Sequence, residues 1–418
     1  MQKPRKVVVT GLGTVNPVGR GVHETWQNLL AGNSGIRRIQ AFDPEEWGLN
    51  THIAGEVKGF DPEEYMDRKE ARRIDRFSQL ALAAAKEAVA LSQLKLEGDT
   101  RYDVGTIIAS GVGGLRTIID QSHILGDWGV RRVSPFTVPM MMPNAASGIV
   151  SIHLGAWGPN FATTSACASS ADSIGVAFDM VRHGRVKAMI AGGSESTIVP
   201  ICVASFEQAQ AITKTHNTTP EKASRPFDLN RDGFVLAEGA AILVLEDEEF
   251  ARERGAQILA ELAGYGAGAD GYHITAPEPQ GRGAVKAMVD ALHDAGEDRD
   301  AVTYINAHGT STQLNDKVET IAINQVFGEA AAKIPVSSTK SMTGHLAGAA
   351  GALEAVISVK VIETAWAPPT INYDTPDPEC TLDYIPWKAR KIKQGLAMSN
   401  SFGFGGHSSC LVFGRYET

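Results

Sequence analysis

Short β-rich runs that end in glycine loops alternate with helix-like segments along almost the whole chain. This alternation is the strongest constraint on the fold, because strands separated by helices form a sheet that helices cover. Seven runs are recognisable, at residues 6–11, 104–111, 188–193, 240–245, 258–264, 302–306 and 396–400. The sequence therefore predicts an α/β fold.

The order of these segments repeats. In each half of the chain a strand leads to a glycine-rich loop, and a run of small residues then opens a helix. The segment around Cys167 in the first half corresponds to the segment from Lys340 to His345 in the second. We therefore expect an internal duplication. One half, residues 1–255, would carry the cysteine, and the other, residues 256–418, would carry two histidines.

Composition excludes several other classes of protein. Of the 418 residues, 43% are hydrophobic and 21% are charged, which is typical of a soluble globular chain with a large core. The net charge of −9 argues against a nucleic-acid-binding surface, and no apolar run reaches membrane-spanning length. The four cysteines lack paired spacing, so we expect neither disulfides nor a zinc ribbon, and we favour a reducing cytosol.

Cys167 lies among small residues, directly before an apolar-periodic segment that ends near Gly184. A cysteine at the N-terminus of such a helix faces free backbone N–H groups and the positive end of the helix dipole, which favour the thiolate over the thiol. Its small neighbours leave room for a substrate. We therefore predict a nucleophile; the alternative is an inert cysteine that packs as a small hydrophobic residue.

Two histidines, each next to a glycine in a loop of small residues, strengthen this prediction. His308 lies in Asn306-Ala-His-Gly-Thr310, and His345 ends the segment Lys340-Ser-Met-Thr-Gly-His345. One such histidine alone is as often a structural hydrogen-bonding group as a catalytic one. Together with Cys167, the pair can supply proton transfer or stabilise an oxyanion.

Two short basic segments stand out in an acidic chain. The first contains Lys69, Arg72 and Arg73 at the apparent start of a helix, and the second is Arg131-Arg132 in a loop. Clustered positive charge can attract an acidic partner. The alternative is an ordinary solvated helix face, since acidic residues are interleaved in the first segment.

Six motifs follow one another along the chain: Ser165-Ala-Cys-Ala-Ser169, Ala223-Ser-Arg-Pro-Phe-Asp228, Arg231-Asp-Gly-Phe-Val235, Asn306-Ala-His-Gly-Thr310, Lys340-Ser-Met-Thr-Gly-His345 and Asn400-Ser-Phe-Gly-Phe-Gly-Gly406. In this order they resemble the elongating β-ketoacyl-acyl carrier protein synthases, most closely the synthase II type. The resemblance covers nearly the whole chain. It implies a thiolase fold, with duplicated halves in a layered αβαβα arrangement, and a cytoplasmic homodimer.

The resemblance also implies a reaction. Enzymes of this kind catalyse decarboxylative Claisen condensation of malonyl-acyl carrier protein with an acyl chain held as a cysteine thioester, which elongates fatty acids by two carbons. The partner is an acidic acyl carrier protein, whose 4'-phosphopantetheine arm carries the substrates. No cofactor and no metal is required.

Residue roles follow from the same resemblance. Cys167 corresponds to the acyl-accepting nucleophile, and His308 and His345 correspond to the histidines that assist decarboxylation. Lys340 resembles the lysine that supports the second histidine electrostatically. Phe404 resembles the phenylalanine that gates access to the cysteine.

Other residues correspond to binding groups. Thr310 and Thr312 would hydrogen-bond the pantetheine arm, although loop capping is an alternative. Val112 resembles the residue at the end of the acyl pocket, and Phe402 a substrate-contacting residue. The basic residues named above would bind the carrier. A supporting group, near a possible structural cation, comprises Asn306, Glu354, Asn400 and Ser401.

The chain departs from the family's usual residues at Gln210, Gln313, Ser408 and Trp128. These departures bear on the carrier surface and on loop mobility, and leave the reaction class unchanged. Two alternatives stay open. One is a ketosynthase subunit of a type II polyketide synthase, and the other is a non-catalytic chain-length partner subunit, which the presence of Cys167 argues against.

Overall fold

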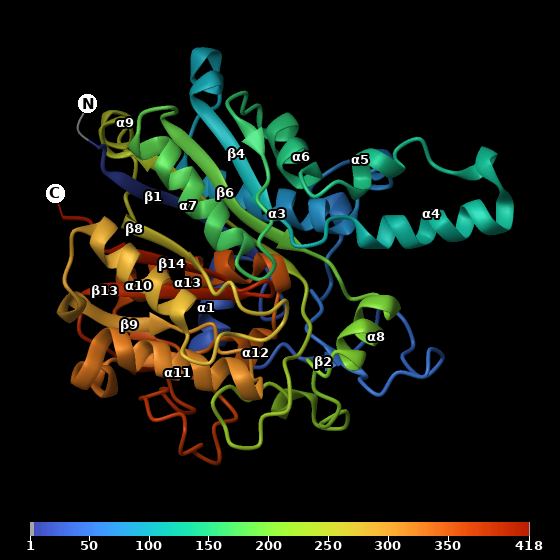
Figure 1. Cartoon of the computed structure of the whole chain (residues 1–418). Coiled ribbons are helices and arrows are strands. Elements are labelled where there is room, and N and C mark those ends of the chain that lie inside the picture. Colours follow the sequence, from blue (N-terminus) through green and yellow to red (C-terminus); the bar gives the residue numbers. More distant parts are fainter. Residues whose placement is uncertain (1–3, 418) are drawn as a thin grey trace.

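Ten strands form one continuous sheet at the centre of the molecule (Figure 1). The computed structural model describes residues 4–417. Along the sheet the strand order is β10-β9-β13-β14-β8-β1-β7-β6-β4-β5. The bounds of these strands are β1 Val7–Val15, β4 Val104–Ala109, β5 Asn160–Phe161, β6 Ala188–Glu195, β7 Gly239–Asp247, β8 Ala260–Ala269, β9 Val302–Asn306, β10 Val336–Ser337, β13 Leu396–Gly403 and β14 His407–Gly414.

The strand order is symmetric about the contact between β1 and β8. Outward from this contact, one half of the sheet runs β1-β7-β6-β4-β5 and the other runs β8-β14-β13-β9-β10. If the five strands of each half are numbered in the order of the chain, their order across the sheet is 1-5-4-2-3 in both halves. The two halves therefore share one topology, while the division of the chain at residue 255 stays a prediction.

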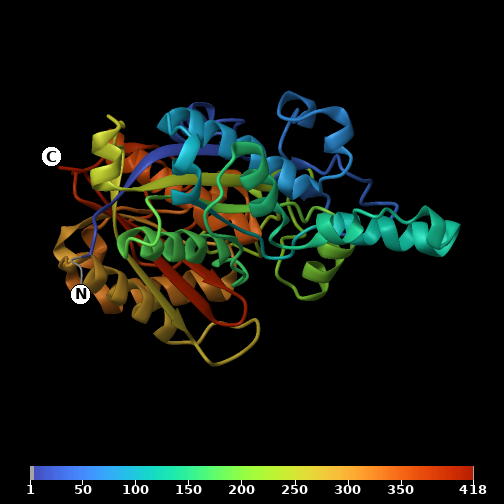
Figure 2. The same ribbon diagram turned by 90° about the horizontal axis from the view of Figure 1, so that it is seen from above.

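The helices form three layers, which alternate with the two halves of the sheet. Helices α7 (Ser169–Arg182) and α13 (Ala350–Thr364) lie in the middle and contact strands of both halves. Helix α3 (Arg76–Ser92) covers the outer face of the first half and α10 (Arg282–Ala295) that of the second (Figures 1 and 2). Nearly all of α13 is buried, as expected for a helix that is apolar all round. The predicted α/β class and layered arrangement are confirmed.

No helix within residues 4–417 is both long enough and apolar enough to cross a bilayer.

Smaller elements connect the layers of helices and strands. The remaining helices are α1 Val22–Leu30, α2 Arg68–Ala71, α4 Leu115–Trp128, α5 Thr137–Met141, α6 Ala145–Leu154, α8 Pro200–Gln208, α9 Glu248–Glu253, α11 Gln313–Phe327 and α12 Lys340–Thr343, and the minor strands are β2 Arg37–Arg38, β3 Ile53–Ala54, β11 Trp366–Ala367 and β12 Arg390–Lys391.

The basic segment near residue 70 does not open one continuous helix, as the sequence suggested. Helix α2 ends at Ala71, and α3 begins at Arg76. Between them, the Asp75 carboxylate accepts a hydrogen bond from the Phe77 N–H at 3.3 Å. An N-cap carboxylate of this kind satisfies a backbone donor that has no partner within the helix. The helix is therefore interrupted because Asp75 starts a new one.

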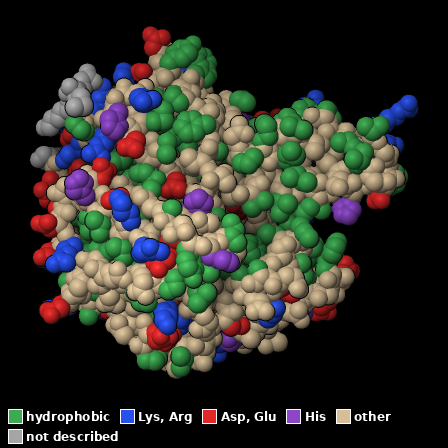
Figure 3. All heavy atoms as spheres, in the orientation of Figure 1, with side chains coloured by type: hydrophobic (Ala, Val, Ile, Leu, Met, Phe, Trp, Pro, Cys, Tyr) green, Lys and Arg blue, Asp and Glu red, His purple; other side chains and the backbone are tan. Residues whose placement is uncertain are grey.

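Helix α4 and the 3-10 turn Val130–Arg132 form an arm that projects from the body (Figures 1 and 2). Within α4, Thr117 is the one buried residue. Apolar side chains along the arm are exposed, by 71% at Trp128 and 77% at Val130, and Figure 3 shows hydrophobic side chains along this projection. The arm therefore receives little stabilisation from its own chain.

Candidate active site

Cys167 lies in the tight turn that leads into α7. Ala166 adopts a left-handed backbone conformation (φ 51°), and α7 begins two residues after the cysteine. Gly403 of the β13–β14 hairpin packs against this turn, where a Cβ atom would lie 2.7 Å from the Ser165 carbonyl oxygen and 3.1 Å from the Cys167 nitrogen. Only glycine permits so close an approach. The hairpin thereby brings the backbone N–H of Phe404 to the sulfur.

Burial raises the pKa of the Cys167 thiol from its ordinary value of 9.0 to about 11, while the charge of Lys340 and the N–H of Phe404 act in the opposite direction. Two pKa units correspond to about 2.7 kcal/mol. A helix N-terminus stabilises an anion by at most about 2 kcal/mol. The thiol is therefore the resting form at neutral pH. The expectation that the helix N-terminus makes the thiolate the favoured form is not met, because burial outweighs the dipole.

Alkylation of Cys167 by iodoacetamide should therefore accelerate roughly tenfold per pH unit between about pH 7 and pH 9. Only the thiolate reacts, and below the pKa its fraction grows tenfold with each unit. The rate is measured by mass spectrometry of the peptide that contains Cys167, in a Cys202→Ala background, because Cys202 is also partly exposed. A rate that is already constant above pH 7 would contradict a raised pKa.

His308 and His345 line the same cavity as Cys167. Their ring centroids are 5.4 Å apart, with the ring planes at 85°, and the two residues are 2% and 3% exposed. Burial and the charge of Lys340 hold the pKa of each histidine well below 6.5. Both rings are therefore neutral at physiological pH. A neutral imidazole keeps one N–H donor, which is the form that can bind a developing oxyanion.

Lys340 contacts the first histidine directly. Its ammonium group donates to the His308 carbonyl oxygen at 2.7 Å, to His308 Nδ1 at 3.3 Å and to the Glu354 carboxylate. Since an ammonium group can only donate, Nδ1 of His308 accepts and Nε2 carries the proton. The electrostatic effect that the resemblance implied for the second histidine is present, because the charge of Lys340 lowers the pKa of His345 as well as that of His308. The hydrogen bonds of Lys340 to His308 are an addition that the resemblance did not indicate.

His345 is fixed through its backbone and by packing. Its N–H donates to the Val235 carbonyl at 2.8 Å, and its carbonyl accepts from the Ala237 N–H at 2.9 Å. Its ring packs edge-on against Phe234 at a centroid distance of 5.2 Å. The segment around residue 235, which carries one of the six sequence motifs, therefore positions the second histidine.

Glu319 of α11 is a site residue that the sequence analysis missed. Its carboxylate accepts from the backbone N–H groups of His308 at 2.8 Å and Gly309 at 2.7 Å. Burial raises its pKa to about 7, against the lowering effect of these two hydrogen bonds. Glu319 thus holds the loop that carries the first histidine. The available signal was its place on one helix face with Asp316 and Thr320, both also buried.

The cavity has a volume of about 440 Å³ and brings all four predicted substrate-binding residues together. Val112, Thr310, Thr312, Phe402 and Phe404 all line it. The two threonine hydroxyls are 2.9 Å apart. Phe404 is 38% exposed at the hairpin turn, so the gate proposed from the resemblance lies at the cavity surface.

Three of the four departures from the family pattern also line this cavity, namely Gln210, Gln313 and Ser408. Gln210 has a left-handed backbone conformation (φ 54°). Trp128 lies elsewhere, at the end of α4 on the arm. Three of the departures therefore lie in the wall of the cavity, and one lies on the outer surface.

The predicted carrier-binding residues fall in two places. Lys69, Arg72 and Arg73 are exposed in and just after α2, and Arg131 and Arg132 are exposed at the far end of the arm. Figure 3 shows basic side chains at that end. Within one chain the structure does not bring the two groups together.

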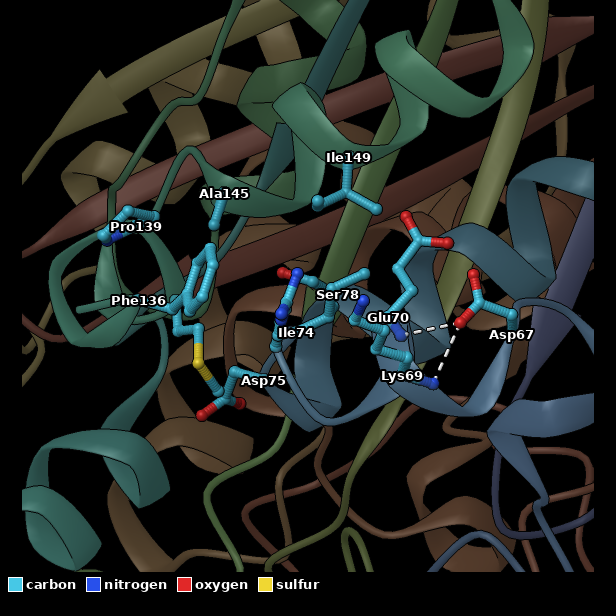
Figure 4. A pocket seen from close by; sticks show the side chains of 12 residues that line it. Asp67, Lys69, Glu70, Ile74, Asp75, Ser78, Phe136, Pro139, Ala145 and Ile149 are labelled. Atoms are coloured by element: carbon cyan, nitrogen blue, oxygen red, sulfur yellow. Dashed lines mark hydrogen bonds between the residues drawn. The ribbon is translucent and has the colours of Figure 1, made fainter. Parts of the chain in front are cut away.

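A second cavity, of about 520 Å³, adjoins the first basic group (Figure 4). Lys69 and Arg73 line it together with the apolar side chains of Ile74, Phe136 and Ile149. The Arg73 guanidinium lies 4.7 Å from the centroid of the Phe136 ring. The basic group therefore combines positive charge with apolar surface.

The residues assigned to a possible cation carry buried oxygens without partners. Oδ1 of Asn306, Oε2 of Glu354, Oδ1 of Asn400 and Oγ of Ser401 have no hydrogen-bond partner among the described residues. They come from the neighbouring strands β9 and β13 and from helix α13. Carboxylate, amide and hydroxyl oxygens are the ligands that hard cations prefer, so these oxygens are of the chemical kind that such an ion binds.

The chain matches two domain families, "Beta-ketoacyl synthase, N-terminal domain" over residues 4–251 and "Beta-ketoacyl synthase, C-terminal domain" over residues 259–374. It is 49% identical over 413 residues to the 3-oxoacyl-(acyl-carrier-protein) synthase 2 of Synechocystis sp., which covers 99% of both chains. A protein of the same name from Staphylococcus aureus is 49% identical over 417 residues and covers both chains in full. The chain belongs to the β-ketoacyl synthase family.

Solved structures share the fold. A β-ketoacyl synthase from Burkholderia phymatum superposes with a TM-score of 0.90 at 37% identity, over 99% of this chain and 100% of that one. A type II polyketide ketosynthase, solved in complex with its acyl-carrier protein and bound to a hexaketide, gives a TM-score of 0.91 at 35% identity over the same shares. The predicted thiolase-like fold is therefore confirmed.

Proposed function

We propose that the protein catalyses the decarboxylative Claisen condensation of malonyl-acyl carrier protein with an acyl chain held on Cys167, as a β-ketoacyl-acyl carrier protein synthase of type II. One observation carries this proposal: a cysteine at a helix start shares a cavity with two buried, neutral histidines. The 49% identity with 3-oxoacyl-(acyl-carrier-protein) synthases 2 over the full length supports fatty-acid elongation.

The first step transfers the acyl chain to the enzyme. The Cys167 sulfur attacks the thioester carbon of the acyl carrier, a C–S bond to the enzyme forms, and the bond to pantetheine breaks. The thiol proton ends on the departing pantetheine sulfur. The backbone N–H of Phe404, which lies at the sulfur, and that of Cys167 itself would hold the oxyanion. Each donor of this kind is worth about 3 kcal/mol in the transition state.

The second step generates and uses the carbanion. The malonyl carboxylate leaves as carbon dioxide, and the electron pair it leaves behind forms an enolate. The N–H groups of the neutral His308 and His345 would bind the enolate oxygen. The enolate carbon then attacks the Cys167 thioester, a C–C bond forms, and the C–S bond breaks. The cysteine sulfur leaves as thiolate and recovers a proton from water. No step calls for a redox cofactor.

The remaining cavity residues would position the substrates. Thr310 and Thr312 would hydrogen-bond the amides of pantetheine, and Val112 and Phe402 would contact the acyl chain. A structural cation on the four unpartnered oxygens would stiffen the region around Glu354, and Glu354 in turn pairs with Lys340. The buried positions of these oxygens support this role.

An assay of condensation tests the proposed function. Purified protein is incubated with malonyl-carrier and acyl-carriers of graded length, and β-ketoacyl product is detected by mass spectrometry. Formation of a product two carbons longer, with release of carbon dioxide, is expected. Absence of product at every length would contradict the proposal.

An acidic acyl carrier protein is the proposed partner, and the exposed basic groups support this. We expect Arg72→Glu to raise the KM for acyl-carrier about tenfold at low salt, and the difference to shrink as salt screens the charges. The value of kcat should change little, because Arg72 lies outside the cavity. Lys393→Glu, an exposed lysine outside both basic groups, is the control. Equal KM values at low salt would remove Arg72 from the interface.

We also propose a cytoplasmic homodimer. Strand β5 is an exposed edge of the sheet, and the arm presents apolar side chains to solvent. Unpaired strand edges and apolar patches favour association. A second copy would cover both, and it would bring a further arm with its basic tip.

A type II polyketide ketosynthase is the second candidate function. The fold similarity to ketosynthases of that kind favours it, while the higher identity to fatty-acid relatives favours the first. Product analysis separates them. Reduced fatty-acid intermediates should serve as primers for a fatty-acid enzyme, whereas successive unreduced extensions would indicate a polyketide enzyme.

A further inference from the structure

Glu195 is a buried acid that none of the proposed steps uses. It is the last residue of β6, is 0% exposed, and lines the cavity that contains Cys167. Within the described chain its hydrogen-bond donors are all uncharged. A buried carboxylate is tolerated only when such donors replace its hydration. Its position therefore calls for a structural reason.

The donors come from two segments that are far apart in the sequence. Ser110 Oγ donates to Oε1 at 2.7 Å, and the Gly111 N–H donates to Oε2 at 2.7 Å. The Gly348 N–H donates to the same Oε2 at 3.0 Å, and the N–H of Val112 contributes a further hydrogen bond. One carboxylate thus ties the loop after β4 to the turn that follows His345.

Two glycines make this junction possible. A Cβ on Gly111 would lie 2.8 Å from Oε2 of Glu195, and a Cβ on Gly348 would lie 2.7 Å from the same atom and 2.3 Å from the Gly111 nitrogen. Any side chain at these positions would push the segments apart. The two loops are therefore in direct contact, with the carboxylate between them.

The same loop carries Val112, the predicted end of the acyl pocket, and contacts the segment that leads to Cys167. Ser110 Oγ also accepts from the Gly113 N–H at 2.8 Å, which closes the 110–113 loop around Val112. The Ser110 carbonyl accepts from Thr164 Oγ1 at 3.1 Å, three residues before Cys167. Val112 itself is 43% exposed in the single chain, so packing within this chain holds its side chain only in part. Its position depends on the backbone of the loop.

We infer that Glu195 is a positioning residue: it holds the 110–113 loop in place and, through Val112, sets the length of acyl chain that the cavity accepts. The inference rests on the proposed function, in which Val112 contacts the acyl chain, and on the resemblance that places Val112 at the end of the acyl pocket. An apolar residue at position 195 would fill the space and leave the loop without its anchor. The carboxylate supplies the acceptors that the loop's backbone donors need.

The test measures kcat/KM for acyl-carriers of increasing length and records the drop between the longest chain accepted and the next one. Glu195→Ala should reduce this drop about tenfold, since a pocket wall that yields no longer rejects an extra methylene. Glu195→Gln should keep the drop within about threefold of the parent, because its amide oxygen can still accept from both glycine N–H groups and its NH₂ can donate to Ser110.

A second variant and a control guard against loss of folding. Ser110→Ala removes one donor to the Glu195 carboxylate. Like Glu195→Ala, it should reduce the drop in kcat/KM beyond the longest chain accepted, but by a smaller factor. Glu87→Ala is the matched control, because Glu87 of α3 also anchors backbone N–H groups, those of Thr14 and Val22, outside the cavity. It should lower stability and leave the drop unchanged.

The outcomes are distinct. An unchanged drop in Glu195→Ala and Ser110→Ala would overturn the inference, as would an equal change in Glu87→Ala or a Gln variant that behaves like the Ala variant. A parent protein without condensation at any length would contradict the proposed function instead. The positioning role would then be decided by hydrogen exchange, which should accelerate at amides 111–113 and 348 in Glu195→Ala.

Discussion

Cys167→Ala should lower the rate of condensation by at least about four orders of magnitude, the scale seen when a nucleophile is removed from an active site that acts as a unit. Without the sulfur no acyl-enzyme can form, and the enolate has no thioester to attack. The fold should persist, because the change removes one atom that borders the cavity and not a contact within the packed core. Product formation is measured by mass spectrometry, and folding by thermal denaturation.

The control is Cys202→Ala. Cys202 is another partly exposed cysteine, on α8, and its loss should leave the condensation rate unchanged. Elongation by Cys167→Ala at a rate near that of the parent would remove the cysteine from the mechanism. A Cys167→Ala variant that still decarboxylates malonyl-carrier is compatible with the mechanism, because both histidines remain.

His308→Ala and His345→Ala should each lower malonyl decarboxylation by about 10²- to 10³-fold, the usual effect of deleting one oxyanion donor. Acyl transfer to Cys167 should continue in both variants, because the donors for that step are backbone N–H groups. Carbon dioxide release and the intact mass of the protein report the two steps separately. His183→Ala, at an exposed histidine after α7, should show parental rates in both.

The pH profile of the same reaction gives a further check on the histidines. Since the pKa of each ring is held well below 6.5, both stay neutral as the pH falls from about 8 to 6. The two rings should therefore add no titration of their own to the decarboxylation rate across this range, whereas Glu319 and Glu354, whose pKa values burial raises to about 7, titrate within it. A fall in rate centred near pH 6.5 that persists in Glu319→Gln and in Glu354→Gln would mean that a histidine with an ordinary pKa is involved. Normal decarboxylation by either alanine variant would reject that residue's role.

Local patterns in the sequence predicted the fold and the main site residues well. The runs that became β1, β4, β6, β7, β8, β9 and β13 were visible because each is a short, mostly apolar stretch, and several of them lead into glycine. The start of α7 followed from small residues before an apolar period. The break between α2 and α3 was missed, although Asp75 carries the N-cap signal for it.

Long-range contacts were not predictable in the same way. The hydrogen bonds of Lys340 reach His308, which is 32 residues away, and nothing local indicates which histidine it would meet. Glu195 binds backbone N–H groups of loops that are 84 and 153 residues away, Glu319 binds those of the loop just before its own helix, and a backbone donor has no signature in the sequence. The pKa of Cys167 depends on how much protein surrounds the sulfur, whereas the sequence revealed only the helix behind it.

Acyl transfer to Cys167 can be observed as the intact mass of the protein after incubation with an acyl-carrier. We expect an increase equal to one acyl group per chain, located at Cys167 by peptide mapping and discharged when malonyl-carrier is added. Condensed product formed with no acyl group ever detected on Cys167, or an acyl group that malonyl-carrier does not remove, would contradict the proposed mechanism.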